Sequence, residues 1–182
     1  MRWIVSRPWL AAGTLVLAAA SPSHSQETGE AEASKPLPRS VTAVFGDWTT
    51  RCVSSADGDE ALACEAAQYV HLPDQKQPVA QTVLRRIDNG LEMIVEVAPD
   101  VSFPGKVQVQ LGDTSGDVVL DWARCLPAAC VAAGTIPAEV VQSWIGGGQA
   151  GMFSYVGGNG AAFRYPISPL GLEQALQGIT LE

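Results

Sequence analysis

The most reactive side chains of this sequence belong to four cysteines, which occur as two close pairs, Cys52 with Cys64 and Cys125 with Cys130. A redox pair typically has the spacing Cys-x-x-Cys at the start of a helix, whereas four residues lie between Cys125 and Cys130. A structural zinc site uses short Cys-x(2–4)-Cys knuckles, whereas eleven residues lie between Cys52 and Cys64. The even number of cysteines predicts two disulfides, because exported thiols are oxidised in pairs. Of the three possible pairings we favour Cys52–Cys64 with Cys125–Cys130, since partners near in sequence meet without long excursions.

Acid–base chemistry has few candidates. If a secretion signal is cleaved after Ser25, His71 is the one histidine left, and no Gly-x-Ser-x-Gly motif accompanies it. The remaining enzymatic hypothesis is a hydrolase with paired carboxylates. Its candidates lie near aromatic residues in the sequence: Asp47, Glu65, Asp117 and Asp121. Acidic residues on the solvent face of strands usually serve solvation. We therefore predict no catalytic, cofactor-binding or metal-binding residue, and we keep the paired-carboxylate hydrolase as the alternative.

The first 25 residues have the three parts of a signal peptide. Arg2 and Arg7 are followed by an apolar run from Trp9 to Ala20 and then by small residues, which allow cleavage after Ala20 or after Ser25. The run is shorter than the roughly 20 apolar residues that cross a bilayer. Residues 26–40 are polar, acidic and contain proline. They cannot bury enough apolar surface to fold, so we expect a flexible acidic arm. Residues 41–182 have the size of one domain.

Charge restricts the class of partner. Removal of the first 25 residues leaves nine of the eleven basic residues against all nineteen acidic ones, a formal charge of −10. A nucleic-acid-binding protein needs a basic surface, so nucleic acid is not expected as a partner. Acidity also disfavours anionic membrane surfaces, and no later segment has the length of a membrane span, so no stable membrane insertion is expected.

Hydrophobic residues alternate with period two in several segments. One such segment contains Val107, Val109 and Leu111, another contains Leu91, Met93, Val95 and Val97, and a third contains Val44, Trp48 and Cys52, which share one parity and are expected on one strand face. The alternation is typical of antiparallel strands with one buried face. Asp88-Asn89-Gly90 favours a tight hairpin turn between two such runs. We therefore predict a mainly β fold, an antiparallel β-sandwich or flattened barrel of seven to nine strands.

Two short helices are predicted beside the strands. Pro137 suits a first helical position, and Val140, Val141, Trp144 and Ile145 follow as an apolar stripe that ends at Gly146. Ser168-Pro169 is the predicted start of the second helix. Its apolar residues at helical spacing are Leu172, Ala175, Leu176 and Ile179.

Any binding site should contain exposed aromatic side chains, because tyrosine and tryptophan supply rigid contact area at low entropic cost. The candidates in the glycine-rich C-terminal third are Trp144, Tyr155 and Tyr165. Trp144 also lies on the apolar stripe of its helix, a position that favours the core. Tyr155 and Tyr165 flank the Gly157-Gly158-Asn159-Gly160 turn.

An ordered set of short motifs resembles the invasion-associated locus B family of exported bacterial proteins. The set consists of Phe45-Gly46-Asp47-Trp48, Cys52, Cys64, Cys125-x4-Cys130 followed by Val-Ala, Ala162-Phe163-Arg164-Tyr165-Pro166, and Leu170-Gly171-Leu172-Glu173-Gln174-Ala175-Leu176. Leu172 departs from the phenylalanine that is frequent there, which is a change in packing.

The resemblance implies a β-rich domain in the periplasm or outside a Gram-negative cell, named for a role in host-cell invasion. It brings no catalytic residue or cofactor. Together with the residues above, it suggests a non-enzymatic, disulfide-linked binding or envelope domain. Its expected partner is an unidentified protein or envelope component, and virulence through host interaction is the role the family name implies.

Overall fold

The computed structural model describes residues 40–54, 62–88, 90–113 and 118–179. All of these belong to one compact unit, Pro36–Glu182. The expected signal peptide and residues 26–39 of the expected arm lie outside the described residues. Ser40, which we assigned to the arm, is the first residue of a strand.

Ten strands and two helices make up the described part of the chain. In chain order they are β1 (Ser40–Phe45), β2 (Trp48–Ser54), β3 (Leu62–Val70), β4 (Ala80–Ile87), β5 (Gly90–Val97), β6 (Lys106–Gln110), β7 (Val118–Cys125), β8 (Cys130–Ile136), α1 (Ala138–Gly147), β9 (Gly151–Val156), β10 (Ala162–Ile167) and α2 (Leu172–Gly178).

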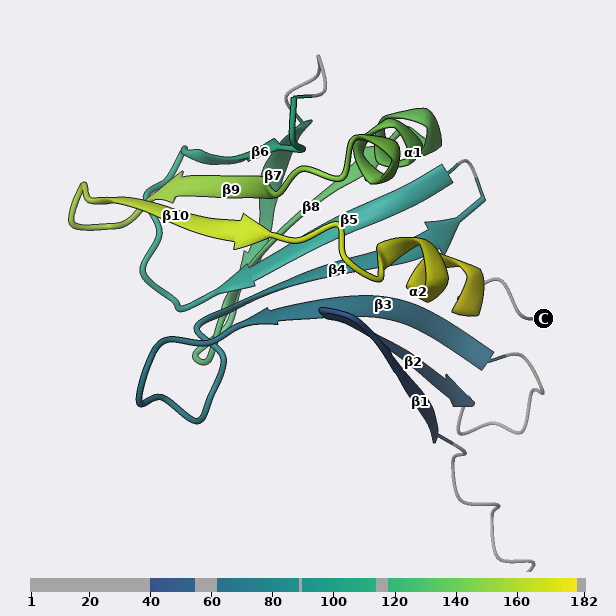
Figure 1. Cartoon of the computed structure of the whole chain (residues 1–182). Helices are drawn as coiled ribbons and strands as arrows, with labels where there is room; N and C mark the ends of the chain where they lie inside the picture. Colours follow the sequence, from purple (N-terminus) through teal and green to yellow (C-terminus); the bar gives the residue numbers. More distant parts are fainter. Residues whose placement is uncertain (1–39, 55–61, 89, 114–117, 180–182) are drawn as a thin grey trace, which may run out of the picture. The chain divides into compact units, whose positions relative to one another are not determined.

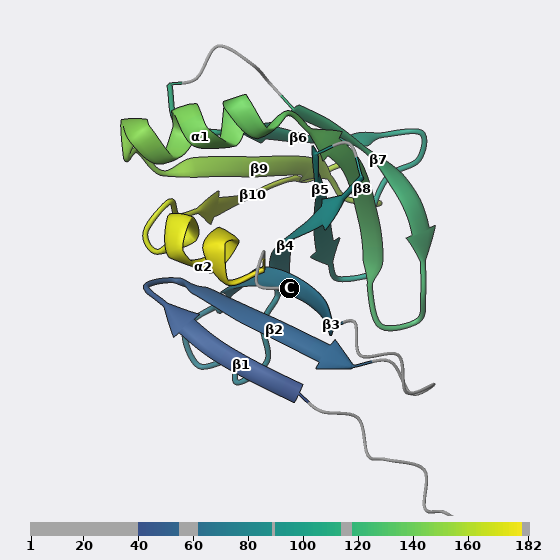
Figure 2. The same cartoon turned by 90° about the vertical axis from the view of Figure 1, so that its right-hand side faces the viewer.

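All ten strands join a single antiparallel sheet in the order β1-β2-β3-β4-β5-β8-β7-β6-β9-β10. Figures 1 and 2 show that the sheet curls into a half-barrel, with the β1–β2 hairpin at one end of the curl and the β9–β10 hairpin at the other. The mainly β, antiparallel prediction with two short helices is thus confirmed. The sheet has ten strands, more than the seven to nine expected.

The concave face of the sheet holds the core. Alternate residues of each strand point inward, among them Leu84, Met93, Val95, Val107 and Leu120, all fully buried. Helix α2 lies across the open side of the curl, between β10 and the first three strands (Figure 2). Its buried residues are Leu172, Ala175 and Leu176. The helix therefore supplies the apolar wall that the half-closed sheet lacks.

Both helices begin and end close to the predicted positions, with one clear shift. Helix α1 starts after Pro137 and ends at Gly147, and the next residue, left-handed Gly148, donates its N–H to the carbonyls of Trp144 and Ile145. Helix α2 begins three residues later than Pro169 suggests, after Gly171 with φ 85°. A glycine in this conformation redirects the chain before the helix starts.

The β1–β2 turn is the part of the fold that the alternation pattern misplaced. The pattern put Val44, Trp48 and Cys52 on one strand face. In the structure a two-residue turn at Gly46 and Asp47 separates two strands, with Phe45 paired to Trp48. Trp48 and Cys52 point inward as expected, but Val44 is 70% exposed. The turn changes the phase of the alternation, so residues before it cannot share a face with residues after it.

This turn packs against the start of α2, and we call the contact between residues 45–48 and 168–171 the hairpin–helix junction. The Trp48 indole N–H donates to the Ser168 carbonyl at 2.7 Å, and the Asp47 amide donates to the Leu170 carbonyl at 3.1 Å. A Cβ placed on Gly171 would lie 1.9 Å from the Phe45 carbonyl oxygen. Two of the motifs that carry the family resemblance therefore meet here and have a structural role.

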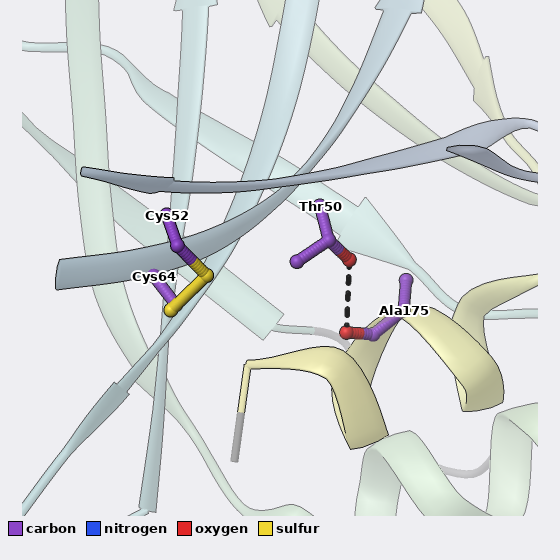
Figure 3. Close-up of a disulfide and its surroundings, with 4 residues drawn as sticks. All are labelled: Thr50, Cys52, Cys64 and Ala175. Atoms are coloured by element: carbon purple, nitrogen blue, oxygen red, sulfur yellow. Dashed lines mark hydrogen bonds between the residues drawn. A yellow bond between two sulfur atoms is a disulfide. The ribbon is translucent and has the colours of Figure 1, made fainter. Parts of the chain in front are cut away.

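The cysteines pair as the sequence favours, Cys52 with Cys64 and Cys125 with Cys130. Each disulfide joins directly opposed residues of neighbouring antiparallel strands. Figure 3 shows Cys52–Cys64 on the side of β2 that faces α2, close to Thr50, whose hydroxyl donates to the Ala175 carbonyl at 3.1 Å. One disulfide thus lies beside the contact between sheet and helix, and the other closes the tight β7–β8 turn.

Loss of the disulfides is expected to have unequal effects. Replacing Cys52 and Cys64 with serine should cost about 3 kcal/mol of unfolding free energy, because the bridge closes the longer loop, and replacing Cys125 and Cys130 about 2 kcal/mol. Urea unfolding of the two double variants measures both values. Peptide mapping without reductant checks the pairing, and a Cys52–Cys125 crosslink or a titratable thiol in the folded chain would contradict it.

Candidate binding surface

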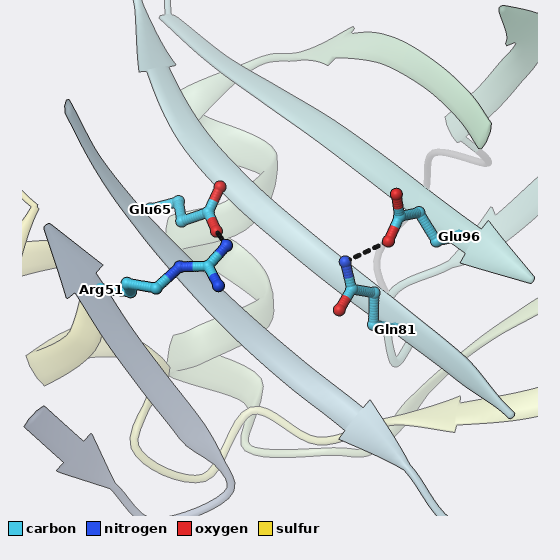
Figure 4. A network of polar contacts seen from close by, with 4 residues as sticks. All are labelled: Arg51, Glu65, Gln81 and Glu96. Carbon is cyan, nitrogen blue, oxygen red and sulfur yellow. Dashed lines mark hydrogen bonds and ion pairs between the residues drawn. The ribbon is translucent and has the colours of Figure 1, made fainter. Parts of the chain in front are cut away.

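Two of the carboxylates considered for hydrolysis, Glu65 and Asp121, lie far apart in the sheet. Glu65 on β3 accepts a hydrogen bond from Arg51, and Asp121 on β7 lies 2.6 Å from the Lys106 ammonium. Three strands stand between β3 and β7, so the two carboxylates are about 19 Å apart along the sheet. Paired carboxylates in glycosidases lie within about 9.5 Å. Figure 4 shows Arg51 and Glu65 together on neighbouring strands.

The other candidates for chemistry are not brought together in the described part of the chain. Asp47 lies in the β1–β2 turn, and Asp117 is outside the described residues. His71 is exposed just after β3. Within the described ranges no group of three His, Cys, Asp or Glu side chains could hold a metal ion. Nor does any helix described here have the length and apolarity to cross a membrane.

Six aromatic rings form a continuous series on the concave side of the sheet, and we call them the aromatic row. Its members come from β7, β9, β10 and the loop between β5 and β6: Phe103, Trp122, Phe153, Tyr155, Phe163 and Tyr165.

Strand pairing sets the spacing of the row. Phe163 lies opposite Tyr155 across the β9–β10 pair, and their rings stack with centroids 5.2 Å apart. Trp122 meets Tyr155 edge to face at 5.7 Å, and Phe103 lies 6.4 Å from Trp122. The row runs from fully buried Phe153 to Phe103, which is 61% exposed. Edge-to-face and offset rings at such distances attract one another.

Backbone contacts hold the exposed end of the row in place. The loop that carries Phe103 is joined to the β9–β10 hairpin, because the Ser102 amide donates to the Val156 carbonyl at 2.9 Å and the Gly158 amide to the Asp100 carboxylate at 2.9 Å. Strand β7 has a β-bulge between Trp122 and Arg124. Bulges change the direction of neighbouring side chains. The row therefore ends in a positioned aromatic surface and not in a free loop.

Tyr155 lies at the centre of the row as a neutral phenol. Burial raises the pKa of its hydroxyl far above the ordinary value for tyrosine, and the hydrogen-bonded Tyr165 and the charge of Asp100 raise it further. An ionised phenol would need solvation that this site does not provide. Tyr155 thus contributes apolar contact and a hydrogen bond.

The predicted patch of Trp144, Tyr155 and Tyr165 needs correction as an exposed surface. Trp144 is 1% exposed and Tyr155 is 5% exposed, so neither offers its ring to a partner. The Trp144 indole donates to the Gln149 carbonyl at 2.7 Å, and the ring packs on the apolar side of α1. Tyr165 is half-buried, and its ring lies 6.4 Å from that of Tyr155. The structure brings the two tyrosines together and leaves Trp144 outside the row.

Three members of the row were not predicted as site residues: Phe103, Trp122 and Phe163. Trp122 alternates with polar neighbours like an inward strand residue, and Phe163 belongs to one of the motifs that carry the family resemblance. Both patterns favour a core position over an exposed one. Of the three, Phe103 is the one whose exposure the sequence could have indicated. A phenylalanine directly before Pro-Gly lies in a turn, where a large apolar side chain has little chance of burial.

The comparisons with known proteins agree with this fold. The model of the "Invasion associated locus B (IalB) protein" family matches residues 48–180. A search of the curated proteins finds no match. Among solved structures, the crystal structure of invasion associated protein B from Bartonella henselae is similar, with a TM-score of 0.64 and 15% sequence identity, over 76% of this chain and 95% of that one. At this identity the likeness shows a shared fold, whereas the family match spans most of the chain: the chain belongs to the invasion associated locus B family.

Proposed function

We propose that this chain is an exported, non-enzymatic binding domain of the bacterial envelope that takes part in contact with host cells. Its binding surface is the solvent end of the aromatic row, where Phe103 is exposed beside half-buried Trp122. The observation that carries the proposal is this ordered, exposed aromatic group, in a domain where the candidate carboxylates Glu65 and Asp121 lie on separate strands. The two disulfides suit an oxidising compartment, and the family name supports a role in invasion.

The chemistry of the surface indicates the class of partner. Phe103 and Trp122 offer apolar area, and Asp100 adds a negative charge next to the same hairpin. The whole chain is acidic, with a formal charge of −8. Like charge repels anionic polymers, so a neutral or basic protein surface with an apolar centre fits best.

Replacement of Phe103 with alanine should weaken partner binding by about 30-fold or more, because an exposed aromatic at the centre of an interface is a typical hot spot. The mature chain is used to capture proteins from envelope and host-cell surface extracts, and the affinity of the captured partner is measured for both forms. Val119→Ala is the matched control. Val119 is on β7, the strand of Trp122, but is exposed on the opposite face.

If Phe103→Ala weakens binding no more than Val119→Ala does, the binding site lies elsewhere on the domain.

An assay for hydrolysis tests the non-enzymatic part of the proposal. The purified chain is expected to leave peptidoglycan and a glycan panel intact. Turnover that a single Asp or Glu substitution abolishes would contradict that part.

A further inference from the structure

A polar pocket lies on the convex face of the sheet. A pocket of about 340 Å³ opens where β4 begins and β5 ends, which is a volume in the range of small-molecule sites. Its apolar walls come from the β3–β4 loop, the end of β5 and the tight β7–β8 turn, with Pro78, Ala98 and Ala129 among the lining residues.

The polar lining of this pocket consists of three glutamines and one glutamate: Gln75, Gln77, Gln81 and Glu96. Each glutamine amide both donates and accepts hydrogen bonds. Gln81 and Glu96 are opposite one another on β4 and β5, and the Gln81 amide donates to the Glu96 carboxylate. Figure 4 shows this pair on the same face as the Arg51–Glu65 ion pair. The pocket thus presents hydrogen-bonding groups of both kinds, and two of them, Gln81 and Glu96, are held by each other.

Glu96 differs from the other strand carboxylates near it. Glu65 is paired with Arg51, Glu92 with Arg85 and Asp121 with Lys106. Among the described residues Glu96 has only the neutral amide of Gln81. Its negative charge is therefore not compensated by a cation of the described sheet. It is half-buried, with acceptor capacity left for a ligand that donates hydrogen bonds.

An exposed aromatic residue, Tyr69, lies across the strands from the Gln81–Glu96 pair. Tyr69 on β3 is opposite Gln81, and Gln81 is opposite Glu96. Tyr69 is 40% exposed. Neighbouring strands are about 4.8 Å apart, so Tyr69 is adjacent to Gln81 across the strands, at the border of the pocket and outside its lining residues. A flat apolar surface beside convergent amide and carboxylate groups suits a molecule with one apolar face and many hydroxyl groups.

From this arrangement we propose that the pocket bordered by Gln75, Gln77, Gln81 and Glu96 binds an uncharged saccharide. Sugar hydroxyls donate to Glu96 and exchange hydrogen bonds with the glutamine amides, while the C–H face of a ring lies on Tyr69. The charge of Glu96 and of the acidic chain repels uronic or sialic acids. The site is on the opposite face of the sheet from the aromatic row and does not depend on the function proposed for that row.

The test is a titration of the isotopically labelled mature chain followed by amide chemical shifts. The probes are oligomers of N-acetylglucosamine, glucose, mannose and galactose, with oligogalacturonate as the acidic counterpart. At least one neutral oligomer should shift the amides of Ala98, Ala128 and Ala129, which line the pocket. Oligogalacturonate should leave them in place. Glu96→Ala should weaken the neutral oligomer about tenfold or more, since a bond to a charged acceptor is lost.

Glu92→Gln is the matched control, because Glu92 lies on the same strand and face but its carboxylate is already paired with the Arg85 guanidinium. This variant should bind the saccharide as the unmodified chain does. Thermal unfolding checks that both variants fold. The proposal is wrong if no neutral oligomer shifts the pocket amides, if oligogalacturonate shifts them equally, or if folded Glu96→Ala keeps its affinity.

Discussion

Replacement of Gly171 with alanine is expected to destabilise the domain by more than about 3 kcal/mol. We expect this to be the largest loss of stability for any glycine-to-alanine replacement in the described part of the chain. Two costs combine. The residue has φ 85°, which alone costs a side chain about 1–2 kcal/mol. The added Cβ would also lie 1.9 Å from the Phe45 carbonyl oxygen and 2.8 Å from the Gly46 nitrogen, both of them backbone atoms that cannot rotate away. Urea unfolding followed by far-ultraviolet circular dichroism measures the change.

Gly160 provides the control for this prediction. Its φ of 81° is nearly the same, but a Cβ there would meet nothing within 4 Å. Gly160→Ala should therefore cost only the conformational term of about 1–2 kcal/mol. The difference between the two variants isolates the close approach at the hairpin–helix junction. Equal losses would show that the two segments are not in contact as described.

Replacement of Trp48 with alanine should cost about 3–5 kcal/mol, the usual range for a large aromatic residue removed from a core. Trp48 is fully buried, and its indole N–H is bonded to the Ser168 carbonyl, 120 residues away in sequence. Trp48→Phe keeps most of the apolar volume and removes the donor, so we expect about 1–3 kcal/mol and faster amide exchange in α2. Chemical unfolding and hydrogen exchange measure the two effects.

Trp144→Phe serves as the comparison, because it removes an indole hydrogen bond of the same 2.7 Å length that closes only five residues. It should destabilise the domain without selectively increasing exchange in α2. If Trp48→Phe leaves the protection of α2 unchanged as well, the bond to Ser168 does not connect the hairpin to the helix.

Local patterns predicted most elements of this fold. The alternation around Met93 and Val107 placed strands with the correct buried face, because a strand must bury one side of its pleat whatever its partners are. Helix α1 followed from Pro137 and its apolar stripe. The disulfide pairing could also be predicted, because each pair of cysteines is near in sequence and a single pair of neighbouring antiparallel strands is enough to bring its members together.

The features that were missed depend on contacts between distant segments. The Gly46–Asp47 turn lacks the Asn-Gly type of signal, and its conformation is fixed by Leu170, more than 120 residues later. Whether Tyr155 is exposed depends on Trp122 and Phe163 from other strands. The sheet has ten strands instead of seven to nine because the Gly46–Asp47 turn divides a run that the alternation treated as one strand into β1 and β2.

The polar pocket could not be recognised from sequence for a similar reason. Gln81 and Glu96 belong to different strands, and only the register of β4 with β5 makes them partners. Each residue alone looks like ordinary solvent-facing polarity. The contrast that singles out Glu96 requires knowledge of which acidic residues have arginine or lysine neighbours across the sheet.

The hairpin–helix junction has a consequence for the order of events in the life of the chain. The partners of Trp48 and Thr50 are separated from them by 120 and 125 residues, so the first hairpin stays incomplete until the last segment of the polypeptide has emerged. Long-range closure of this kind delays folding. For the proposed export such a delay is useful, because a polypeptide passes through a translocation channel only while it is unfolded, and this domain cannot complete its core before α2 is available.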